Sequence, residues 1–390
     1  MKKLVLQLAV ICSTALSAQT DTLSIQEFSE QLKPIETAIG QSFETKDYKT
    51  AENSLLDGVS LFHRLSEKTQ RRNPQILSNF IYYNLACVYS LQNQKKKAVD
   101  AFAESVKYGY SDYAHAKVDS DLDNIRKEKR FVELMNNLAE KYDYVKVLQN
   151  SGKYQKENAQ NSPKFIYESA DADNLKNVRE YFKLDSIAGN GDEISKILNL
   201  LRWVNKNIVH DGSNSANCEF DAIDLYNYHK STGKGVNCRH LSTTLNEMYL
   251  ALGIKSRFVV CLPKDSTDTD CHVINSVYSN DLKKWIWIDP SFNVYMKDEN
   301  GSFLGIEEVR GRFINNQPVI ISDEINHNGE TYTKEDYKNY MAKNLYWLQC
   351  PAESKFNVES RYRKSSEIYV SLVPTGFDPF EKTYRKITNT

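Results

Sequence analysis

The chain has 390 residues, of which 41% are hydrophobic and 26% are charged. This length and composition suit two or three domains with hydrophobic cores, and they exclude a short peptide, a disordered tail or a fibrous repeat. Lys and Arg (50 residues) nearly balance Asp and Glu (51 residues), so the net charge indicates neither a nucleic-acid partner nor general attraction to a membrane surface.

The amino-terminal residues have the pattern of a secretory signal peptide. Two lysines precede a mostly apolar stretch from Leu4 to Leu16, and small residues lead to an expected cleavage near Ala18. The stretch is too short for a membrane span, and no later segment is long and apolar enough for one. We therefore predict a signal peptide at residues 1–18 and an exported protein, periplasmic or extracellular, with no membrane span.

The cysteines are too sparse for a disulfide-stabilised scaffold, so each is judged singly. Cys261 and Cys271 flank a short polar loop, and either a disulfide or two separate thiols is compatible with their spacing.

Residues 24–149 have a helical pattern throughout. Large and small residues alternate at helical spacing in a way that resembles the tetratricopeptide repeat, as in Tyr82, Leu85, Ala86, Tyr89, Ala98 and Phe102. Helix pairs of this kind bury their faces by stacking, and their concave side often holds a peptide or a neighbouring domain. The region is either a plain helical support or a docking surface for a protein partner.

Residues 150–163 are almost without apolar side chains and end in a proline, which predicts a linker. The linker divides the helical domain at 24–149 from a second domain at 164–310, with residues 311–390 as a carboxy-terminal extension. In the second domain, Asp192 is placed to cap a helix whose apolar residues, Leu201 and Val204 among them, recur at spacings of three and four.

A second helix begins at Cys238. Asn237 is a favoured N-cap residue, Leu241 and Leu245 begin an apolar stripe, and Gly253 is a helix stop. A thiol at a helix start lies among free backbone N–H groups at the positive end of the helix dipole, which favours the thiolate. The alternative for any single cysteine is a small buried apolar residue.

Three strands are predicted after this helix, at 255–263, 272–279 and 283–289. A turn at Asn280-Asp281 pairs the last two strands so that His272 lies directly opposite Asp289. The same register places Ile274 opposite Trp287 and Ser276 opposite Trp285. A cysteine, a histidine and an aspartate in this arrangement are the parts of a nucleophile, its base and the residue that orients the base.

These segments together resemble the bacterial transglutaminase-like superfamily, whose papain-like domain keeps the order Cys, His, Asp. The matching pieces are Gly-Val-Asn-Cys-Arg at 235–239, Leu-Gly-Ile-Lys-Ser-Arg at 252–257, His272, and Trp-Ile-Trp-Ile-Asp-Pro at 285–290. The resemblance covers about a quarter of the chain. It implies Cys238 as nucleophile, His272 as general base and Asp289 as its partner, in an α+β fold in which a helix carries the cysteine and an antiparallel sheet carries the other two.

The sequence departs from many family members after the catalytic positions, with Val273 and Ile274 following His272 and Arg239 and His240 following Cys238. These departures bear on the shape of the substrate cleft. The backbone N–H of Cys238 is expected to be one oxyanion donor. The second donor is open, because Asn237 is better used as a cap.

The remaining polar clusters give weaker indications. An acidic loop at 265–270 lacks the glycine and the closing Glu of a calcium loop, which favours a solvated loop. His210, His229 and His240 lack the spacing of a helical zinc site, so we expect no metal and no cofactor. We expect His240 to present a polar edge of its helix.

Past residue 300 we predict a helix at 333–343 and strands at 346–349 and 367–374, without a legible function. The leading hypothesis is an exported cysteine peptidase, amidase or acyltransferase that acts on peptide or protein amide bonds through a thioacyl intermediate on Cys238 and releases it to water or to an amine. The alternative is a non-catalytic binding module that uses its helical repeats.

Overall fold

The computed structural model describes residues 22–155, 164–360 and 368–379. The predicted signal peptide and most of the predicted linker lie outside these residues. The chain divides into two compact units, residues 1–138 and 139–390. In the described part of the chain, no helix combines the length and apolar character that crossing a membrane requires.

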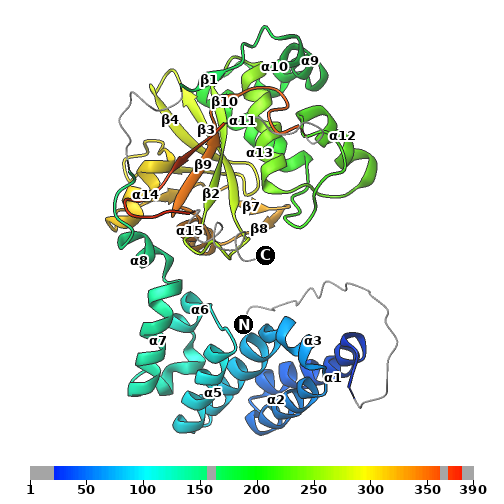
Figure 1. Ribbon diagram of the computed structural model, residues 1–390, viewed down its shortest axis with the longest axis vertical. Coiled ribbons are helices and arrows are strands. Elements are labelled where there is room, and N and C mark those ends of the chain that lie inside the picture. Colours follow the sequence, from blue (N-terminus) through cyan, green and yellow to red (C-terminus); the bar gives the residue numbers. More distant parts are fainter. Residues whose placement is uncertain (1–21, 156–163, 361–367, 380–390) are drawn as a thin grey trace, which may run out of the picture. The chain divides into compact units, whose positions relative to one another are not determined.

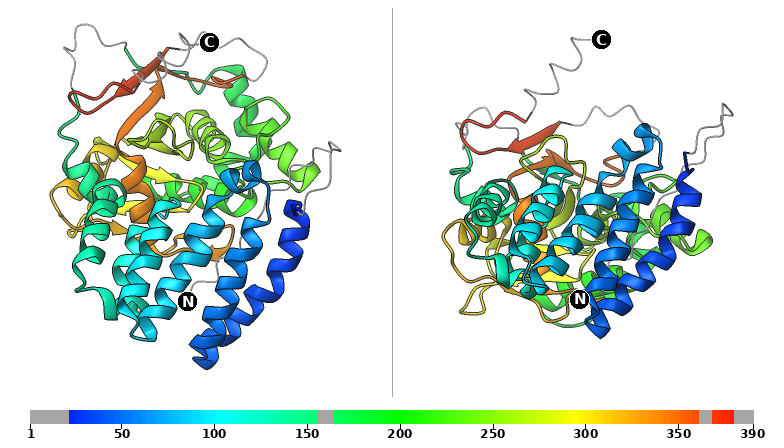
Figure 2. Two further views of the ribbon diagram at one scale, coloured as in Figure 1. Left: turned by 60° about the horizontal axis from the view of Figure 1, so that its bottom comes forward. Right: turned by 90° about the horizontal axis from the view of Figure 1, so that it is seen from below.

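The first unit is helical. Its elements are α1 (Ile25–Thr45), α2 (Tyr48–His63), α3 (Glu67–Arg72), the π-helical segment η1 (Ile76–Tyr82), α4 (Tyr83–Leu91), α5 (Lys95–Lys107), α6 (Tyr113–Val118), the 3-10 segment η2 (Ser120–Ile125) and α7 (Lys129–Tyr142), which crosses the division between the units. Figure 2 shows α1, α2, α4 and α5 side by side. Ala86 and Ala98 are fully buried where α4 packs on α5, so the small residues lie at the helix contact as predicted. The resemblance of these helices to the tetratricopeptide repeat stays a prediction.

The helices of the second unit surround one sheet (Figure 1). They are α8 (Tyr144–Gln149), α9 (Asp173–Phe182), α10 (Leu184–Ala188), α11 (Glu193–Asn207), α12 (Ala222–Thr232), α13 (Cys238–Ala251), α14 (Ile306–Ile314) and α15 (Lys334–Asn344). The predicted cap of α11 is present at Asp192, and Thr333, predicted as the first residue of a helix, caps α15.

Within the described residues the sheet has seven strands in the order β11-β9-β2-β3-β4-β5-β6, all antiparallel. They are β2 (Ser256–Leu262), β3 (His272–Ser279), β4 (Lys284–Asp289), β5 (Val294–Lys297), β6 (Ile320–Ile321), β9 (Trp347–Pro351) and β11 (Tyr369–Leu372). Strand β9 continues through Cys350 and Pro351, where the sequence predicted a stop. Two small pairs complete the unit, parallel β1 (Ile166–Tyr167) with β10 (Glu353–Ser354), and the hairpin of β7 (Asn326–His327) with β8 (Glu330–Thr331).

Each face of the sheet covers its own core. Ile286 and Ile288 of β4 pack on one face with α9, α11, α12 and α13, and Trp287, between them in sequence, packs on the other face with α8, α14 and α15. This alternation follows from the two-residue period of a strand. The second unit is therefore an α+β domain with helices on both faces of an antiparallel sheet, which confirms the predicted fold class.

The register of the β3–β4 hairpin differs from the prediction by two residues. Ser276 lies opposite Trp287 and Ser279 opposite Lys284, so neither Ile274 nor Ser276 has its predicted partner. The connection is a four-residue loop, 280–283, in which Lys283 has a left-handed backbone (φ 53°). The carboxylate of Glu193 accepts hydrogen bonds from Ser279 Oγ and from the backbone N–H groups of residues 280 and 281, which fixes this loop.

Residues 150–155, the described start of the predicted linker, pack on the second unit. Tyr154 donates its hydroxyl to the carbonyl of Leu345 (2.9 Å), and the guanidinium of Arg310 lies over its ring. These contacts fix the path by which the chain leaves α8.

Candidate active site

Cys238 is the first residue of α13 and is half-buried. Asn237 accepts a hydrogen bond from the backbone N–H of His240 (3.1 Å), which confirms the predicted cap, and Gly253 follows the helix end in a left-handed conformation. The thiol therefore lies at the positive end of a 14-residue helix, where a negative charge on sulfur is favoured.

His272 and Asp289 form a buried pair. Nε2 of His272 lies 2.7 Å from Oδ2 of Asp289, and the two side chains are 1% and 0% exposed. The observed register, extended by one pair, puts Ile274 opposite Asp289, so His272 contacts the carboxylate diagonally and is not directly opposite it. The contact survives the shift because two residues along a strand return to the same face.

The Asp289 carboxylate has two further donors. Tyr337 of α15 donates its hydroxyl to Oδ2 (2.6 Å), and the backbone N–H of Ser291 donates to Oδ1 (2.9 Å). Trp287 in turn donates its indole N–H to the Tyr337 hydroxyl (3.2 Å). These contacts orient the carboxylate, and with it the imidazole of His272.

The charges of the site favour a thiolate and an imidazolium. Burial opposes ionisation of Cys238, but hydrogen bonds and charge interactions with the His210 and His272 imidazoles lower the pKa of the thiol to about 6. Burial likewise disfavours the charged form of His272, but the Asp289 carboxylate and the Cys238 thiolate raise the pKa of the imidazole to about 10. Between these values the thiol is deprotonated and the imidazole is protonated.

Aromatic rings surround His272. Phe292 and Tyr340 lie edge-on to the imidazole, with ring centroids 5.5 and 5.3 Å from it. The ammonium of Lys343, one turn after Tyr340, contacts the carboxylates of Asp268 and Asp270, so α15 also holds the acidic loop that precedes β3. The carboxy-terminal extension, residues 311–390, for which the sequence indicated no function, thus supplies part of the site.

The three histidines noted in the sequence have separate surroundings. His229 is half-buried on α12, and its Nδ1 lies 2.9 Å from the carbonyl of Lys234. His240 is buried against Phe220, which corrects the expectation of a polar helix edge. His210 lies beside Cys238 and contacts His327, an arrangement that sequence spacing did not indicate.

Cys261 and Cys271 are not joined by a disulfide. Cys261 is buried in the core beneath α15, whereas Cys271 is half-buried, and burial raises the pKa of both thiols. Cys238 is therefore the cysteine of this region that the surroundings favour as a thiolate.

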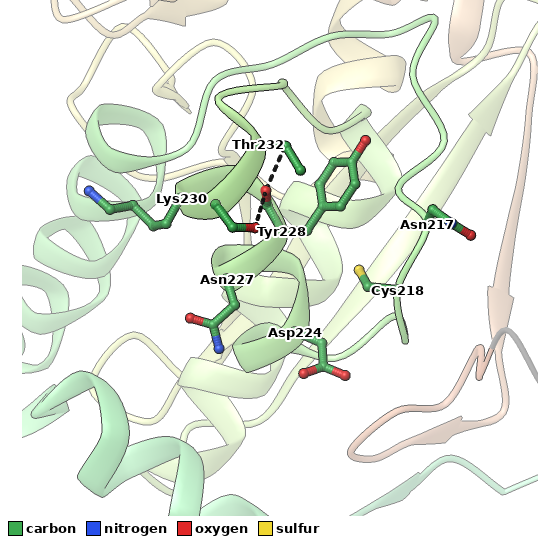
Figure 3. Close-up of a pocket in the computed structure, with 8 residues that line it drawn as sticks. Asn217, Cys218, Asp224, Asn227, Tyr228, Lys230 and Thr232 are labelled. Atoms are coloured by element: carbon green, nitrogen blue, oxygen red, sulfur yellow. Dashed lines mark hydrogen bonds between the residues drawn. The ribbon is translucent and has the colours of Figure 1, made fainter.

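An open hollow of the second unit lies beside α12, and its lining includes Cys218, Tyr228 and Lys230 (Figure 3). A hydrogen bond from Thr232 to the carbonyl of Tyr228 closes the end of the helix there. The lining includes none of Cys238, His272 and Asp289, so this hollow is separate from the site.

Among the described residues, one group of metal-binding side chain types lies close together, namely Cys87, Asp119 and Asp121 in the first unit. Burial raises the pKa of the Cys87 thiol well above its ordinary value, so it stays protonated and donates to Asp119. Tyr83 donates to the same carboxylate (2.7 Å). These hydrogen bonds account for the cluster without a metal.

Comparison with known proteins identifies residues 182–290 as matching the transglutaminase-like superfamily. The match runs from the end of α9 to the end of β4 and includes Cys238, His272 and Asp289. The chain therefore contains a transglutaminase-like domain. His327 and Tyr337 lie beyond the matched residues.

A curated chloroplastic protein from Arabidopsis thaliana is 38% identical over 60 residues, which are 15% of this chain and 18% of that protein. This chain therefore spans less than a fifth of that protein's length. No solved structure matched the chain.

Proposed function

We propose that this protein is an exported cysteine enzyme that acts on amide bonds of peptides or proteins through a thioacyl intermediate on Cys238. The observation that carries the proposal is the buried pair of His272 and Asp289 beside a thiol whose pKa is lowered to about 6 at a helix start. A nucleophile, its base and a third group that orients the base, in this order of contact, are the signature of nucleophilic catalysis by cysteine.

The chemistry follows from the protonation states. The Cys238 thiolate attacks the amide carbonyl, and the His272 imidazolium then gives its proton to the leaving amine. Asp289 keeps Nε2 of His272 protonated and stabilises the imidazolium, which leaves Nδ1 to serve the sulfur and the leaving group. Water attacks the thioester in the second half of the reaction, with His272 now acting as base. We favour water over an amine because amine transfer requires a cleft that excludes water.

The first test is acylation of the full-length protein by p-nitrophenyl acetate, followed as a burst of p-nitrophenol, with the acetylated residue located by mass spectrometry. We expect one acetyl group on Cys238. The burst should grow as pH rises through about 6, because below that value the thiol is protonated. With peptide amides, turnover should fall as pH rises through about 10, because His272 then lacks the proton that the amine needs.

The matched variants separate the nucleophile from the other thiols. Cys238→Ala should keep the fold, because the side chain is small and half-buried, and should lose the burst. Cys271→Ala should keep the burst. A burst that survives in Cys238→Ala, or acetylation elsewhere in the wild type, would remove Cys238 from the mechanism and favour the binding-module alternative.

Tyr337→Phe tests the support of Asp289. The phenyl ring keeps the packing, but Asp289 loses the donor at 2.6 Å. A hydrogen bond to a charged group contributes about 1.5–3 kcal/mol, so we expect acylation about 10- to 100-fold slower. The pH midpoint of Cys238 alkylation should stay near 6, since the ion pair with His272 remains. Tyr278→Phe, at the far end of β3, is the control, and equal rates in the two variants would show that Tyr337 is only a packing residue.

A further inference from the structure

A second imidazole, that of His210, is held next to the nucleophile by the strand-like segment 209–211. The backbone N–H of Val236 donates to the carbonyl of Val209, and the N–H of Asp211 donates to the carbonyl of Val236, each at 2.8 Å. His210 is thereby fixed beside Val236, two residues before Cys238. A Cβ atom at Gly235 would lie 2.7 Å from Cβ of Asp211, so glycine is required for this approach.

The β7–β8 hairpin holds His210 from the other side. Asn328 accepts a hydrogen bond from the backbone N–H of His210 (2.8 Å) and donates its amide to the carbonyl of the same residue (3.0 Å). Asn328 has a left-handed backbone (φ 53°) in the turn of the hairpin, a conformation that asparagine tolerates well. One side chain thus fixes the backbone position of one histidine.

The ring of His210 is oriented by His327. Nδ1 of His210 lies 2.8 Å from Nε2 of His327, and the rings are 70° apart. Phe292 stacks on His327, with centroids 5.1 Å apart, and also contacts His272. Burial and the neighbouring His210 lower the pKa of His327, so its neutral form is favoured.

The free nitrogen of His210 is Nε2. It is buried from solvent and has no hydrogen-bond partner among the described residues, and the imidazole is close enough to the Cys238 thiol to lower the pKa of the thiol. Of the other donors near the sulfur, Tyr340 gives its hydroxyl proton to Asp270 (3.3 Å) and Arg239 is paired with Glu359 (2.7 Å). The His210 and His272 imidazoles are the groups whose hydrogen bonds lower the pKa of the thiol.

We propose that His210 is a further catalytic residue, whose imidazole donates Nε2–H to the Cys238 sulfur and then to the oxyanion, with His327 and Asn328 as positioning residues. In this arrangement Nε2–H of His327 donates to Nδ1 of His210, which leaves the His210 proton on Nε2. The oxyanion role rests on the proposed function, whereas the hydrogen bond to the sulfur does not.

The hydrogen-bond acceptor of His210 changes from sulfur to oxygen during acylation. A sulfur lone pair forms the S–C bond, the carbonyl π pair moves to oxygen, and the negative charge leaves sulfur for that oxygen. The Nε2–H of His210 then donates to the oxyanion beside the backbone N–H of Cys238. When the intermediate collapses, the C–N bond breaks and the amine leaves with the proton from His272. His210 keeps its proton throughout and is thus distinct from the general base.

The test needs no substrate. Alkylation of Cys238 by iodoacetamide is followed by peptide mass spectrometry against pH in the wild type and in His210→Phe, His210→Gln, His327→Phe and His229→Phe. We expect His210→Phe to raise the alkylation midpoint from about 6 by about one pH unit, a roughly tenfold loss of thiolate below the midpoint. His210→Gln, which keeps an N–H donor, should restore most of the difference, and the control His229→Phe, whose histidine is not among the groups that shift the pKa of the thiol, should match the wild type.

His327→Phe should raise the midpoint by a smaller amount, because the proton of His210 is then free to move to Nδ1. This variant also tests the proposal if His210→Phe folds poorly, as judged by circular dichroism. Equal midpoints in the wild type, His210→Phe and His327→Phe would overturn the proposal. A low wild-type midpoint that rises in His210→Phe, with no acetylation by p-nitrophenyl acetate, would instead overturn the proposed function and keep the hydrogen bond to the sulfur.

Discussion

Replacing Asp289 with asparagine should lower acylation of Cys238 about ten-thousandfold while the protein stays folded, the size of loss found when the carboxylate of a comparable triad is made an amide. The substitution keeps the size of a fully buried side chain but removes the charge that faces Nε2 of His272 at 2.7 Å. The pKa of His272 then falls, and the pair of thiolate and imidazolium gives way to a neutral thiol and a neutral imidazole.

The burst with p-nitrophenyl acetate and the alkylation midpoint together check this result. The thiol remains, so iodoacetamide should still modify Cys238, at a higher pH than in the wild type. Asp281→Asn, in the exposed loop of the same hairpin, is the matched control and should acylate normally. Undiminished acylation in Asp289→Asn would show that the carboxylate is structural.

Trp287→Ala should reduce the free energy of unfolding of the second unit by about 3–5 kcal/mol, the range for large aromatic truncations in cores. Trp287 is 0% exposed on the sheet face beneath α15, and its indole N–H donates to the Tyr337 hydroxyl. The variant leaves a cavity and removes a hydrogen-bond donor from the group that holds Asp289, so stability and acylation should fall together.

Urea unfolding followed by far-ultraviolet circular dichroism measures the effect as a lower midpoint at an unchanged slope. Trp285→Ala, two residues earlier on the same strand, is the control. Its side chain is half-buried, packs against Tyr167 and Arg257, and should cost less stability. A smaller loss in Trp287→Ala than in Trp285→Ala would contradict the assignment of the core.

Residues close to the helix ends were sufficient to predict the helix that begins at Cys238. Asn237 as cap, Cys238 as first residue and Gly253 as stop are all found where the sequence placed them, because helix ends depend on residues within one turn. That His272 and Asp289 lie on the same face of the sheet was also predictable. Side chains alternate between the two faces along each strand, so a register error of two residues leaves both side chains on the predicted face.

The register was not predictable from the hairpin alone. The sequence centres the turn on Asn280-Asp281, whereas the connection is centred one residue later, on the loop 280–283, whose backbone Glu193, almost ninety residues earlier, binds. The supporting residues were missed for the same reason. His210, His327 and Tyr337 become recognisable only when contacts across more than forty residues of sequence are known. An aromatic residue spaced like any core residue of a helix, such as Tyr337, carries no local signal of contact with a carboxylate.

The order in which the site residues occur along the chain has a consequence for synthesis. The cysteine emerges from the ribosome well before the β7–β8 hairpin and α15, which bring His327, Asn328 and Tyr337 to it. Until those segments have folded, His210 and Asp289 lack the contacts that orient them. The complete site therefore depends on segments of the chain that are made after the cysteine.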